Sequence, residues 1–257
     1  MAYGYPEFMK DIFLLTKIDL TFYKEAQMKR RIDALIAKEK FPGYKEFVDA
    51  LKADSKKLSE FVEYMTINVS EFYRNPEQWK IMTEKIFPEL IDKFGKNLKI
   101  WSAACSTGDE PYSLVMALSE FVPLNQIRIV ATDISDEVVG KAKIGLYSEK
   151  SIAHVPDKYK KEYFTQNGPF YQISDKIKNC VTFKKHNLLK DDFFKEQHLI
   201  VCRNVLIYFT EDAKDEIFEK YYDSLADGGV LFIGSTEQIL KYRQIGYKKL
   251  DSFFYQR

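Results

Sequence analysis

A single stretch in the middle of the 257-residue chain reads Leu98-Lys99-Ile100-Trp101-Ser102-Ala103-Ala104-Cys105-Ser106-Thr107-Gly108-Asp109-Glu110-Pro111. Its first four residues predict a β-strand, and the small residues after them predict a tight loop whose backbone can approach a ligand closely. Pro111 suits the first turn of a helix, which we expect to run over Tyr112 to Phe121. A strand, a small-residue loop and a helix in this order are typical of the place where doubly wound α/β folds bind a nucleotide.

The charges in this loop set it apart from dinucleotide-binding loops. It lacks the G-x-G-x-x-G spacing, and Asp109 and Glu110 lie beside the start of the helix, where they would repel a pyrophosphate. Two carboxylates suit a cationic ligand instead, such as the sulfonium and amino groups of S-adenosylmethionine (SAM). An ordinary strand–helix turn is the alternative, because the helix dipole also favours acidic residues in the first turn.

A second acidic position supports a ligand site. The next predicted strand, Ile127 to Ala131, leads into Asp133, which lies 25 residues after Gly108. A carboxylate at that strand end can bind both ribose hydroxyls of a nucleoside. An N-cap role, for Asp133 or for Ser135, is the alternative. Because the two acidic positions occur together and in this order, they favour a nucleoside-containing cation over either local explanation.

Later strands bring further polar residues to the same edge. We expect strands at Val181–Phe183, His198–Cys202 and Val230–Ile233. Asn187, with Leu188 after it, follows the first of these strands, where an amide can read the edge of an adenine. Arg203 and Asn204 follow the second strand at the usual place of substrate-facing residues, although the apolar residues 205–207 read equally well as core.

The rest of the chain completes the predicted architecture. From Glu7 to about Leu90, apolar residues recur at three- and four-residue spacing and predict helices. A helix over 211–225 precedes the last central strand, and residues 248–256 are expected to add one more strand. The stretch 145–180 is too long for a bare loop and carries a hairpin signal at Asn167-Gly168-Pro169. The predicted fold is an all-α domain (1–75) followed by a Rossmann-like α/β domain (76–257), with a small antiparallel β-subdomain inserted at about 145–180.

Composition and charge exclude several classes of protein. With 46% hydrophobic and 30% charged residues, the chain is expected to be globular, and its apolar runs are far too short to span a bilayer. Residues 1–9 show no leader pattern, so we expect a cytoplasmic protein. Three cysteines without a C-x-x-C pair and three scattered histidines predict neither a disulfide framework nor a metal site.

Three blocks of the sequence resemble signatures of one family, the chemotaxis receptor methyltransferases of the CheR family. The first block is similar to T-x-N-x-[TS]-x-F-[FY]-R and reads Thr66-Ile67-Asn68-Val69-Ser70-Glu71-Phe72-Tyr73-Arg74. The other two run from Ala103 to Ser113 and from Cys202 to Phe209. The resemblance covers nearly the whole chain. It implies a class I SAM-dependent protein-glutamate O-methyltransferase that modifies cytoplasmic helices of chemoreceptors and releases S-adenosylhomocysteine.

The resemblance also implies roles for single residues. Contacts to the cofactor are expected from Asn68, Ser70, Arg74, Glu110, Asp133, Asn187, Leu188, Arg203 and Asn204. Arg74 and Tyr208 are expected to lie closest to the transferred methyl group and the substrate carboxylate, and no metal ion is expected. Ser70 keeps the hydroxyl of the commoner threonine. Asp109 stands where glutamate is usual, whereas Glu110 is retained.

A basic face on the second predicted helix matches the recognition surface that the resemblance implies. Lys24, Arg31 and Lys38 recur at seven-residue spacing with Arg30 beside them, away from the apolar face of the helix. A solvated face is the alternative reading of such a stripe. The short Asn167-Gly168-Pro169 turn lacks a glycine-rich extension, so we expect an enzyme that does not use a tethering pentapeptide at the receptor's C-terminus.

Two other functions share these features. A SAM-dependent methyltransferase of a small molecule or of RNA would use the same cofactor fold. However, no Pro-Pro-Tyr/Phe tetrad follows Asn204, and nucleic acid is not an expected partner. A non-catalytic SAM-binding scaffold would bind the cofactor without turnover on a receptor. A dehydrogenase is disfavoured because the first loop lacks the pyrophosphate glycines, and we expect a monomer.

Overall fold

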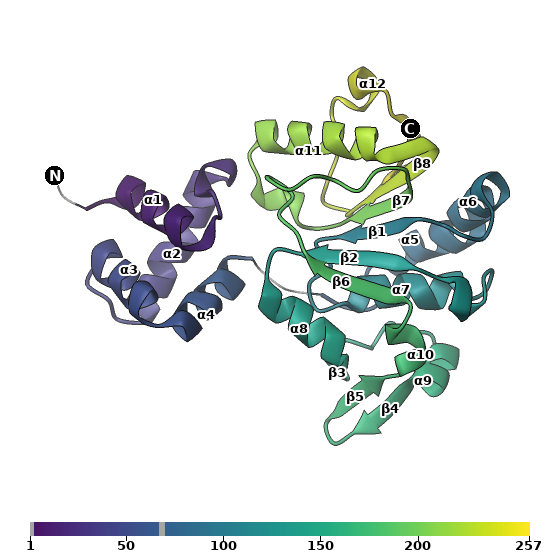
Figure 1. The fold of residues 1–257 in the computed structure, drawn as a ribbon, viewed down its shortest axis with the longest axis horizontal. Helices are drawn as coiled ribbons and strands as arrows, with labels where there is room; N and C mark the ends of the chain where they lie inside the picture. The colour runs from purple at the N-terminus through teal and green to yellow at the C-terminus, as the bar shows by residue number, and fades with distance from the viewer. Residues whose placement is uncertain (1–2, 67–69) are drawn as a thin grey trace. The chain divides into compact units, whose positions relative to one another are not determined.

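The computed structural model describes residues 3–66 and 70–257, and its internal contacts divide the chain into two compact units (Figure 1). The first unit comprises Met1–Asn68 together with Tyr208–Lys214, and the second comprises Val69–Ile207 together with Asp215–Arg257. In the described part of the chain, no helix is both long enough and apolar enough to cross a membrane.

The first unit is a helical domain around an aromatic core. Its helices are α1 (Tyr5–Thr16), η1 (Leu20–Phe22), α2 (Glu25–Lys38), α3 (Tyr44–Ala53) and α4 (Ser55–Met65). The buried rings of Phe8, Phe47 and Phe61 lie with centroids 5.5 to 6.5 Å apart. Asp54 caps α4 by accepting from the backbone N–H groups of residues 56 and 57. The predicted all-α N-terminal domain is therefore confirmed.

A short stretch from late in the chain completes the first unit. The turn η4 (Leu206–Tyr208) ends at Tyr208, and α11 (Glu211–Ser224) begins three residues later. Between these two elements, Phe209 forms an isolated antiparallel bridge with Tyr23, the residue after η1. The helical unit therefore contains a short stretch that follows the loop after β7 of the α/β unit.

The second unit is an α/β domain in which strands and helices alternate (Figure 1). Its strands are β1 (Ile100–Ala103), β2 (Ile129–Asp133), β3 (Leu146–Ser148), β4 (Phe164–Asn167), β5 (Phe170–Ile173), β6 (Val181–Lys185), β7 (Gln197–Cys202), β8 (Leu225–Ile233), β9 (Lys248–Asp251) and β10 (Phe254–Gln256). Besides α11, its helices are α5 (Pro76–Ile81), η2 (Met82–Ile86), α6 (Phe87–Phe94), α7 (Asp109–Leu118), η3 (Leu124–Gln126), α8 (Asp136–Ile144), α9 (Asp157–Tyr163), α10 (Asp175–Lys178) and α12 (Tyr242–Ile245).

The large sheet has seven strands in the order β6-β2-β1-β7-β8-β10-β9. The first five pair in parallel, whereas β10 is antiparallel to both β8 and β9. Ile100 in β1 is level with Ile129 in β2 and with Leu199 in β7. On one side of β1 the sheet continues through β2 to β6, and on the other side it continues from β7 through β8. The carboxyl ends of β1 and β7 therefore form the topological switch point, where such sheets bind ligands.

The central strands are buried on both faces. All four residues of β1 are buried, as are residues 199–202 of β7, which explains why these segments are almost entirely apolar, with Ser102 as the exception. Trp101 is fully buried, and its indole nitrogen donates to the Thr132 hydroxyl at 2.9 Å, so the ring's polar atom has a partner within the sheet. This hydrogen bond helps to hold the carboxyl ends of β1 and β2 side by side.

The inserted subdomain lies between α8 and β6 in the chain. It contains the antiparallel sheet β3-β5-β4 and the helices α9 and α10, which Figure 1 shows as a separate lobe of the second unit. The predicted hairpin is confirmed as β4 and β5, with Gly168 in the left-handed region (φ +59°) at the turn. The predicted Rossmann-like fold with an inserted β-subdomain is therefore confirmed.

Two sequence predictions near the end of the chain were wrong. Residues 248–256 form a two-stranded hairpin instead of one strand, because the chain turns at residues 252 and 253. The helix predicted to reach residue 225 ends at Ser224, and β8 begins at Leu225 instead of Val230. The early start of β8 follows from its pairing with β7, where Leu225 is level with Gln197 before the register shifts. Further along β8, Gly228 N donates to Arg257 O, and Arg257 N donates to Gly229 O, both at 3.0 Å.

Candidate functional site

The loop after β1 turns through three residues in the left-handed region. Ala104, Ser106 and Gly108 have φ values of +64°, +49° and +89°. Only glycine adopts this conformation without strain, so the other two residues must be held by their surroundings. Gly108 is also tightly packed, since a Cβ added there would lie 2.9 Å from the Cβ of Ala142. The tight turn predicted for the first loop is confirmed.

Three hydrogen bonds, two to β2 and one from β3, hold this loop. Cys105 N donates to Thr132 O at 2.8 Å, which extends the pairing of β1 with β2. The hydroxyl of Tyr147, in β3 of the inserted subdomain, donates to Thr107 O at 2.7 Å. Ser106 N donates to Asp133 Oδ2 at 2.9 Å. The strained backbone is therefore fixed from the neighbouring strand and from the subdomain at once.

Asp133 joins the loops after β1 and β2. Besides Ser106 N, its carboxylate accepts from Ser135 N at 3.1 Å and from Ile134 N. Ser135, not Asp133, is the N-cap of α8, because the Ser135 hydroxyl accepts from Val138 N. Burial raises the pKa of Asp133, although the three backbone hydrogen bonds oppose that shift. A carboxylate has about four acceptor positions, so Asp133 retains capacity for a ligand.

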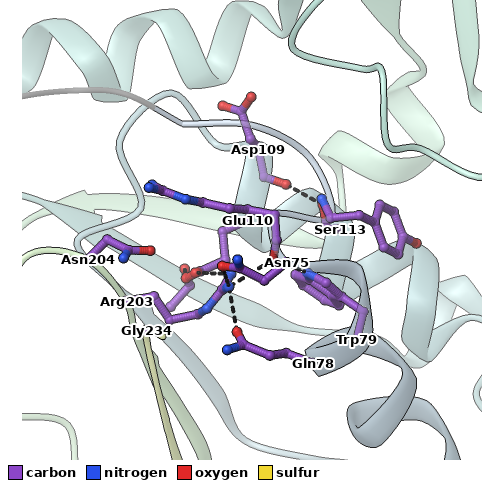
Figure 2. Close-up of polar contacts among 12 residues, drawn as sticks. Asn75, Gln78, Trp79, Asp109, Glu110, Ser113, Arg203, Asn204 and Gly234 are labelled. Atoms are coloured by element: carbon purple, nitrogen blue, oxygen red, sulfur yellow. Dashed lines mark hydrogen bonds and ion pairs between the residues drawn. The ribbon is translucent and has the colours of Figure 1, made fainter. Parts of the chain in front are cut away.

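Glu110 and Arg203 face each other across the switch point (Figure 2). Arg203 Nη1 lies 3.6 Å from Glu110 Oε2, and the Ser102 hydroxyl donates to Glu110 Oε1 at 2.9 Å. The side chain of Arg203 is 3% exposed and that of Glu110 is 13% exposed. Burial raises the pKa of Glu110, while the charge of Arg203 opposes the rise. A buried carboxyl in this state gains from a second cation beside it.

Arg203 also organises the segment that leads into α5. Its Nη2 donates to Asn75 Oδ1 (3.1 Å) and Gln78 Oε1 (2.8 Å), as Figure 2 shows, and to Arg74 O (2.8 Å). Its guanidinium lies over the Phe232 ring. The carbonyl of Arg74 accepts a second bond from Trp79 Nε1 at 3.1 Å. The backbone of Arg74 is thus fixed beside the switch point. Burial lowers the pKa of Arg203, the charge of Glu110 opposes that shift, and the charge of Arg74 adds to it.

The segment Ser70 to Tyr73 is attached to α7 and to the inserted subdomain. A hydrogen bond from the side chain of Ser70 lowers the pKa of Asp109, opposing the rise that burial causes. The buried Phe72 ring contacts the rings of Tyr147 and Phe164 at centroid distances of 4.7 and 5.4 Å. Tyr73 N donates to the hydroxyl of Ser113 at 3.1 Å. The first signature block therefore packs into the α/β unit from residue 70 onward.

The loop after β7 is held by a carboxylate that the sequence analysis missed. Glu237 accepts from four backbone N–H groups, those of Asn204, Val205, Leu206 and Gly234, at 2.8 to 3.1 Å. It is 7% exposed, and Asn204 has left-handed backbone (φ +61°). A usable signal was present, because Glu237 follows a central strand by four residues, as Asp133 ends one.

Other predicted residues lie at the same edge of the sheet. Asn187 follows β6, next to the end of β2, since His186 N donates to Asp133 O at 2.9 Å. The Asn187 side chain accepts from Leu189 N at 3.0 Å, and Leu188 is buried. Asn68 lies outside the described residues, and Tyr208 belongs to the helical unit. The structure therefore brings Ser70, Arg74, Glu110, Asp133, Asn187, Arg203 and Asn204 to one edge of the α/β unit.

The basic face of α2 divides into two kinds of residue. Lys24, Arg30 and Lys38 are exposed. Arg31 is half-buried: its guanidinium lies 4.8 Å from the centroid of the Tyr64 ring, and its Nη2 donates to Tyr64 O at 2.6 Å. Arg31 therefore fastens α2 to α4, whereas the other three side chains reach solvent.

The switch-point cluster is rich in acid. Four buried or half-buried carboxylates, those of Asp109, Glu110, Asp133 and Glu237, gather there with two guanidinium groups, Arg203 and Arg74. Burial raises the pKa of each of these four carboxyls. A positively charged ligand bound there would favour the ionised form of any of these carboxyls that lies directly beside it.

Comparison with known proteins gives two family matches that together span nearly the whole chain. The sequence model described as "CheR methyltransferase, SAM binding domain" matches residues 68–252. The model described as "CheR methyltransferase, all-alpha domain" matches residues 4–66.

Full-length relatives agree with these matches. A chemotaxis protein methyltransferase of Listeria innocua is 40% identical over 257 residues, which cover 97% of this chain and 98% of that protein. One of Listeria monocytogenes gives the same identity and coverage. A third, from Borreliella burgdorferi, is 32% identical over 90% of this chain and 86% of its own length.

Proposed function

Since the chain belongs to the CheR methyltransferase family and is thus a SAM-dependent methyltransferase of chemotaxis, we propose that it forms methyl esters on glutamate side chains of chemoreceptors. The proposed substrates lie on the cytoplasmic helices of the receptor, and the product of the cofactor is S-adenosylhomocysteine. The observation that carries this proposal is the acidic cluster around Glu110 at the switch point, which suits a sulfonium donor.

The residues at the switch point fit SAM by their chemistry. Glu110 is a half-buried carboxylate suited to the amino group, and Asp133 has acceptor capacity left for ribose hydroxyls. Asn187 and Leu188 offer an amide and an apolar side chain for the adenine. Ser106 has a buried hydroxyl without a partner among the described residues, in the loop that would lie nearest a nucleoside. A pyrophosphate would meet like charge at the same place.

In the proposed reaction the protein orients groups and moves no proton. When bound, SAM supplies a methyl group on positively charged sulfur, and the C–S bonding electrons return to sulfur as a carboxylate oxygen takes the methyl. A glutamate has an ordinary pKa near 4.3, so the nucleophile is ionised at neutral pH and needs no general base. Arg74 would hold the substrate carboxylate through a bidentate pair, and the Tyr208 hydroxyl would donate to its second oxygen. Alignment of the reacting atoms then supplies the rate.

Partners follow from the same proposal. The exposed Lys24, Arg30 and Lys38 would bind an acidic receptor helix, while Arg31 would act by fastening α2. We expect a cytoplasmic monomer that acts without a tethering peptide, since only Gly168 and Pro169 join β4 to β5. Nucleic acid is not a proposed partner.

The proposal is tested with methyl-labelled SAM and a receptor cytoplasmic fragment. We expect label in base-labile esters, and peptide mapping should place it on glutamates of the receptor helices. A fragment with alanine at the mapped glutamates is the control and should stay unlabelled. Label in RNA or in a small molecule, or tight SAM binding without any turnover, would contradict the proposal.

Arg74→Ala tests the proposed orientation of the carboxylate. The bonds from Arg203 and Trp79 end on the Arg74 carbonyl, so the backbone contacts survive this change. Loss of an orienting guanidinium should lower kcat/KM by about 100-fold. Arg74→Lys keeps the charge without the planar fork and should recover only part of the loss. Near-normal methylation by Arg74→Ala would remove Arg74 from the mechanism.

A further inference from the structure

A strand-like contact in the described part of the first unit involves two predicted functional regions. Tyr23 and Phe209 form the isolated antiparallel bridge, and their rings meet edge to face at a centroid distance of 4.8 Å. Lys24 N donates to Tyr208 O at 3.0 Å, and Thr210 N donates to Phe22 O at 2.8 Å. The stretch 208–210 is thus paired with the residues that lead directly into the basic helix α2.

Lys24 belongs both to the start of α2 and to the paired stretch around Tyr208. Its carbonyl accepts from Gln27 N (3.1 Å) and Met28 N (3.0 Å) and so starts α2, while its own N–H is bonded to Tyr208 O. The exposed Lys24 side chain belongs to the basic face. A displacement of the start of α2 would therefore pull on the backbone of Tyr208 through one peptide group.

The segment around Tyr208 is anchored on both sides. Leu206 N is bonded to Glu237 Oε1 at 2.9 Å within the α/β unit. Two residues beyond Tyr208, Thr210 begins α11: its hydroxyl accepts from Ala213 N and its carbonyl from Lys214 N. Phe209 is buried, which adds apolar contact to the bridge. Short anchors on each side leave the Tyr208 backbone little freedom.

We propose that the bridge between Tyr23 and Phe209 positions Tyr208 for methyl transfer and couples it to the receptor-binding face of α2. Tyr23, Phe209 and the N–H of Lys24 are positioning groups, since they act through Tyr208. An acidic helix bound on α2 would stabilise the bridged state, and the bridged state would hold the Tyr208 hydroxyl in place. This inference rests on the proposed function, because it assigns a task to the same recognition face and the same tyrosine.

A proline at position 24 removes the backbone N–H of Lys24 with little change in backbone conformation. Lys24 has φ −59° and ψ 102°, and Tyr23 before it has φ −100° and ψ 153°. Both conformations suit an X-Pro pair, and proline has no N–H to donate to Tyr208 O. Lys24→Pro therefore removes the bond to Tyr208 together with the charge, whereas Lys24→Ala removes the charge alone. Glu25→Pro places the same ring at the first helical position, where proline is tolerated, and controls for the ring itself.

Kinetics on the receptor fragment separate recognition from positioning. Both Lys24 variants should raise KM for the fragment. Lys24→Pro should in addition lower kcat by about threefold to tenfold, which corresponds to losing one backbone hydrogen bond of about 1 kcal/mol. Phe209→Leu in the Lys24→Pro background should lower kcat further. Equal kcat values for Lys24→Pro and Lys24→Ala, or an equal loss in Glu25→Pro, would overturn the proposal.

Hydrogen exchange tests the bridge without any substrate. The amide of Thr210 should exchange faster in Lys24→Pro than in Lys24→Ala, while SAM affinity should match between the two variants. Unchanged exchange would overturn the inference. If the wild-type protein bound SAM but left the receptor fragment unmethylated, the proposed function would fail independently, and a catalytic role for the bridge would fail with it.

Discussion

The loops after β1 and β7, on the two sides of the switch point, are held by the same device. In each case backbone N–H of a loop with left-handed residues donates to a carboxylate that ends or follows the neighbouring strand. Asp133 at the end of β2 holds Ser106, and Glu237 beyond β8 holds residues 204–206. The pairing of strands therefore decides which acid supports which loop.

The two carboxylates differ in the capacity that they have left. Glu237 accepts four N–H bonds, which fills about the four positions that a carboxylate offers. Asp133 accepts three and has room for a ligand. Two buried acids on the two sides of the switch point therefore have different tasks: Glu237 supports backbone, and Asp133 supports backbone and has acceptor capacity left for a ligand.

The largest effect is expected from removing the side chain that lies between the two loops. Arg203→Met leaves Glu110 without its ion-pair partner and removes three hydrogen bonds to residues 74, 75 and 78. Breaking a buried pair on one side costs about 3–5 kcal/mol, so Tm should fall by about 10 °C. Calorimetry measures this loss, and the methylation assay should show a loss of at least about 100-fold.

Arg203→Lys is the matched control for that change. A lysine keeps the charge beside Glu110, yet it cannot reach several acceptors in the planar arrangement that a guanidinium allows. It should therefore recover part of the stability and less of the activity. A Tm for Arg203→Met within about 2 °C of the wild type would show that the two loops do not depend on Arg203.

An intermediate effect is expected from a matched pair of amide substitutions. Glu237→Gln replaces one acceptor oxygen by an N–H₂ group and leaves two backbone N–H groups without an acceptor. Each unsatisfied N–H costs about 1–3 kcal/mol, so Tm should fall by about 5–10 °C. Asp133→Asn should lower Tm less but weaken SAM binding by about tenfold, since a charge-assisted bond to the ligand is lost. Thermal melting measures the fall in Tm, and titration calorimetry measures the loss of SAM affinity. Glu237→Gln should show the larger fall in Tm, and Asp133→Asn the larger loss of affinity. If the two variants change both quantities equally, the assigned difference between the acids is wrong.

The sequence predicted the β1 side of the site better than the β7 side, for a physical reason. The loop, Gly108 and Asp133 belong to one strand–helix–strand unit, whose geometry follows from local pattern. Glu237 and Gln78 act on residues far along the chain, Gln78 on Arg203 at a separation of 125 positions, and only the assembled sheet brings them together. The same holds for Arg31, whose contact with Tyr64 depends on how α4 packs against α2.

The smallest effect is expected in the pH dependence of SAM binding, and its sign follows from burial. The pKa values of Glu110 and Asp133 are raised in the cofactor-free protein, so above their ordinary values near 4 the folded state holds more protons than the unfolded state. Because ∂ΔG_unfold/∂pH then is negative, this contribution to the free energy of unfolding falls as pH rises through that window. A bound cation favours the ionised carboxylates, so binding should release protons and strengthen as pH rises.

Proton release on SAM binding then distinguishes Glu110 from Glu237. Titration calorimetry at about pH 5, in two buffers of different ionisation enthalpy, should detect release of a fraction of one proton on SAM binding. Glu110→Gln should reduce that release, because the variant has no carboxyl to ionise beside the ligand. Glu237 has its positions filled by backbone N–H groups with or without ligand, so Glu237→Gln should leave the release nearly unchanged. Release lost in Glu237→Gln and kept in Glu110→Gln would reverse the assignment, placing the ligand-linked charge on the β8 side of the switch point.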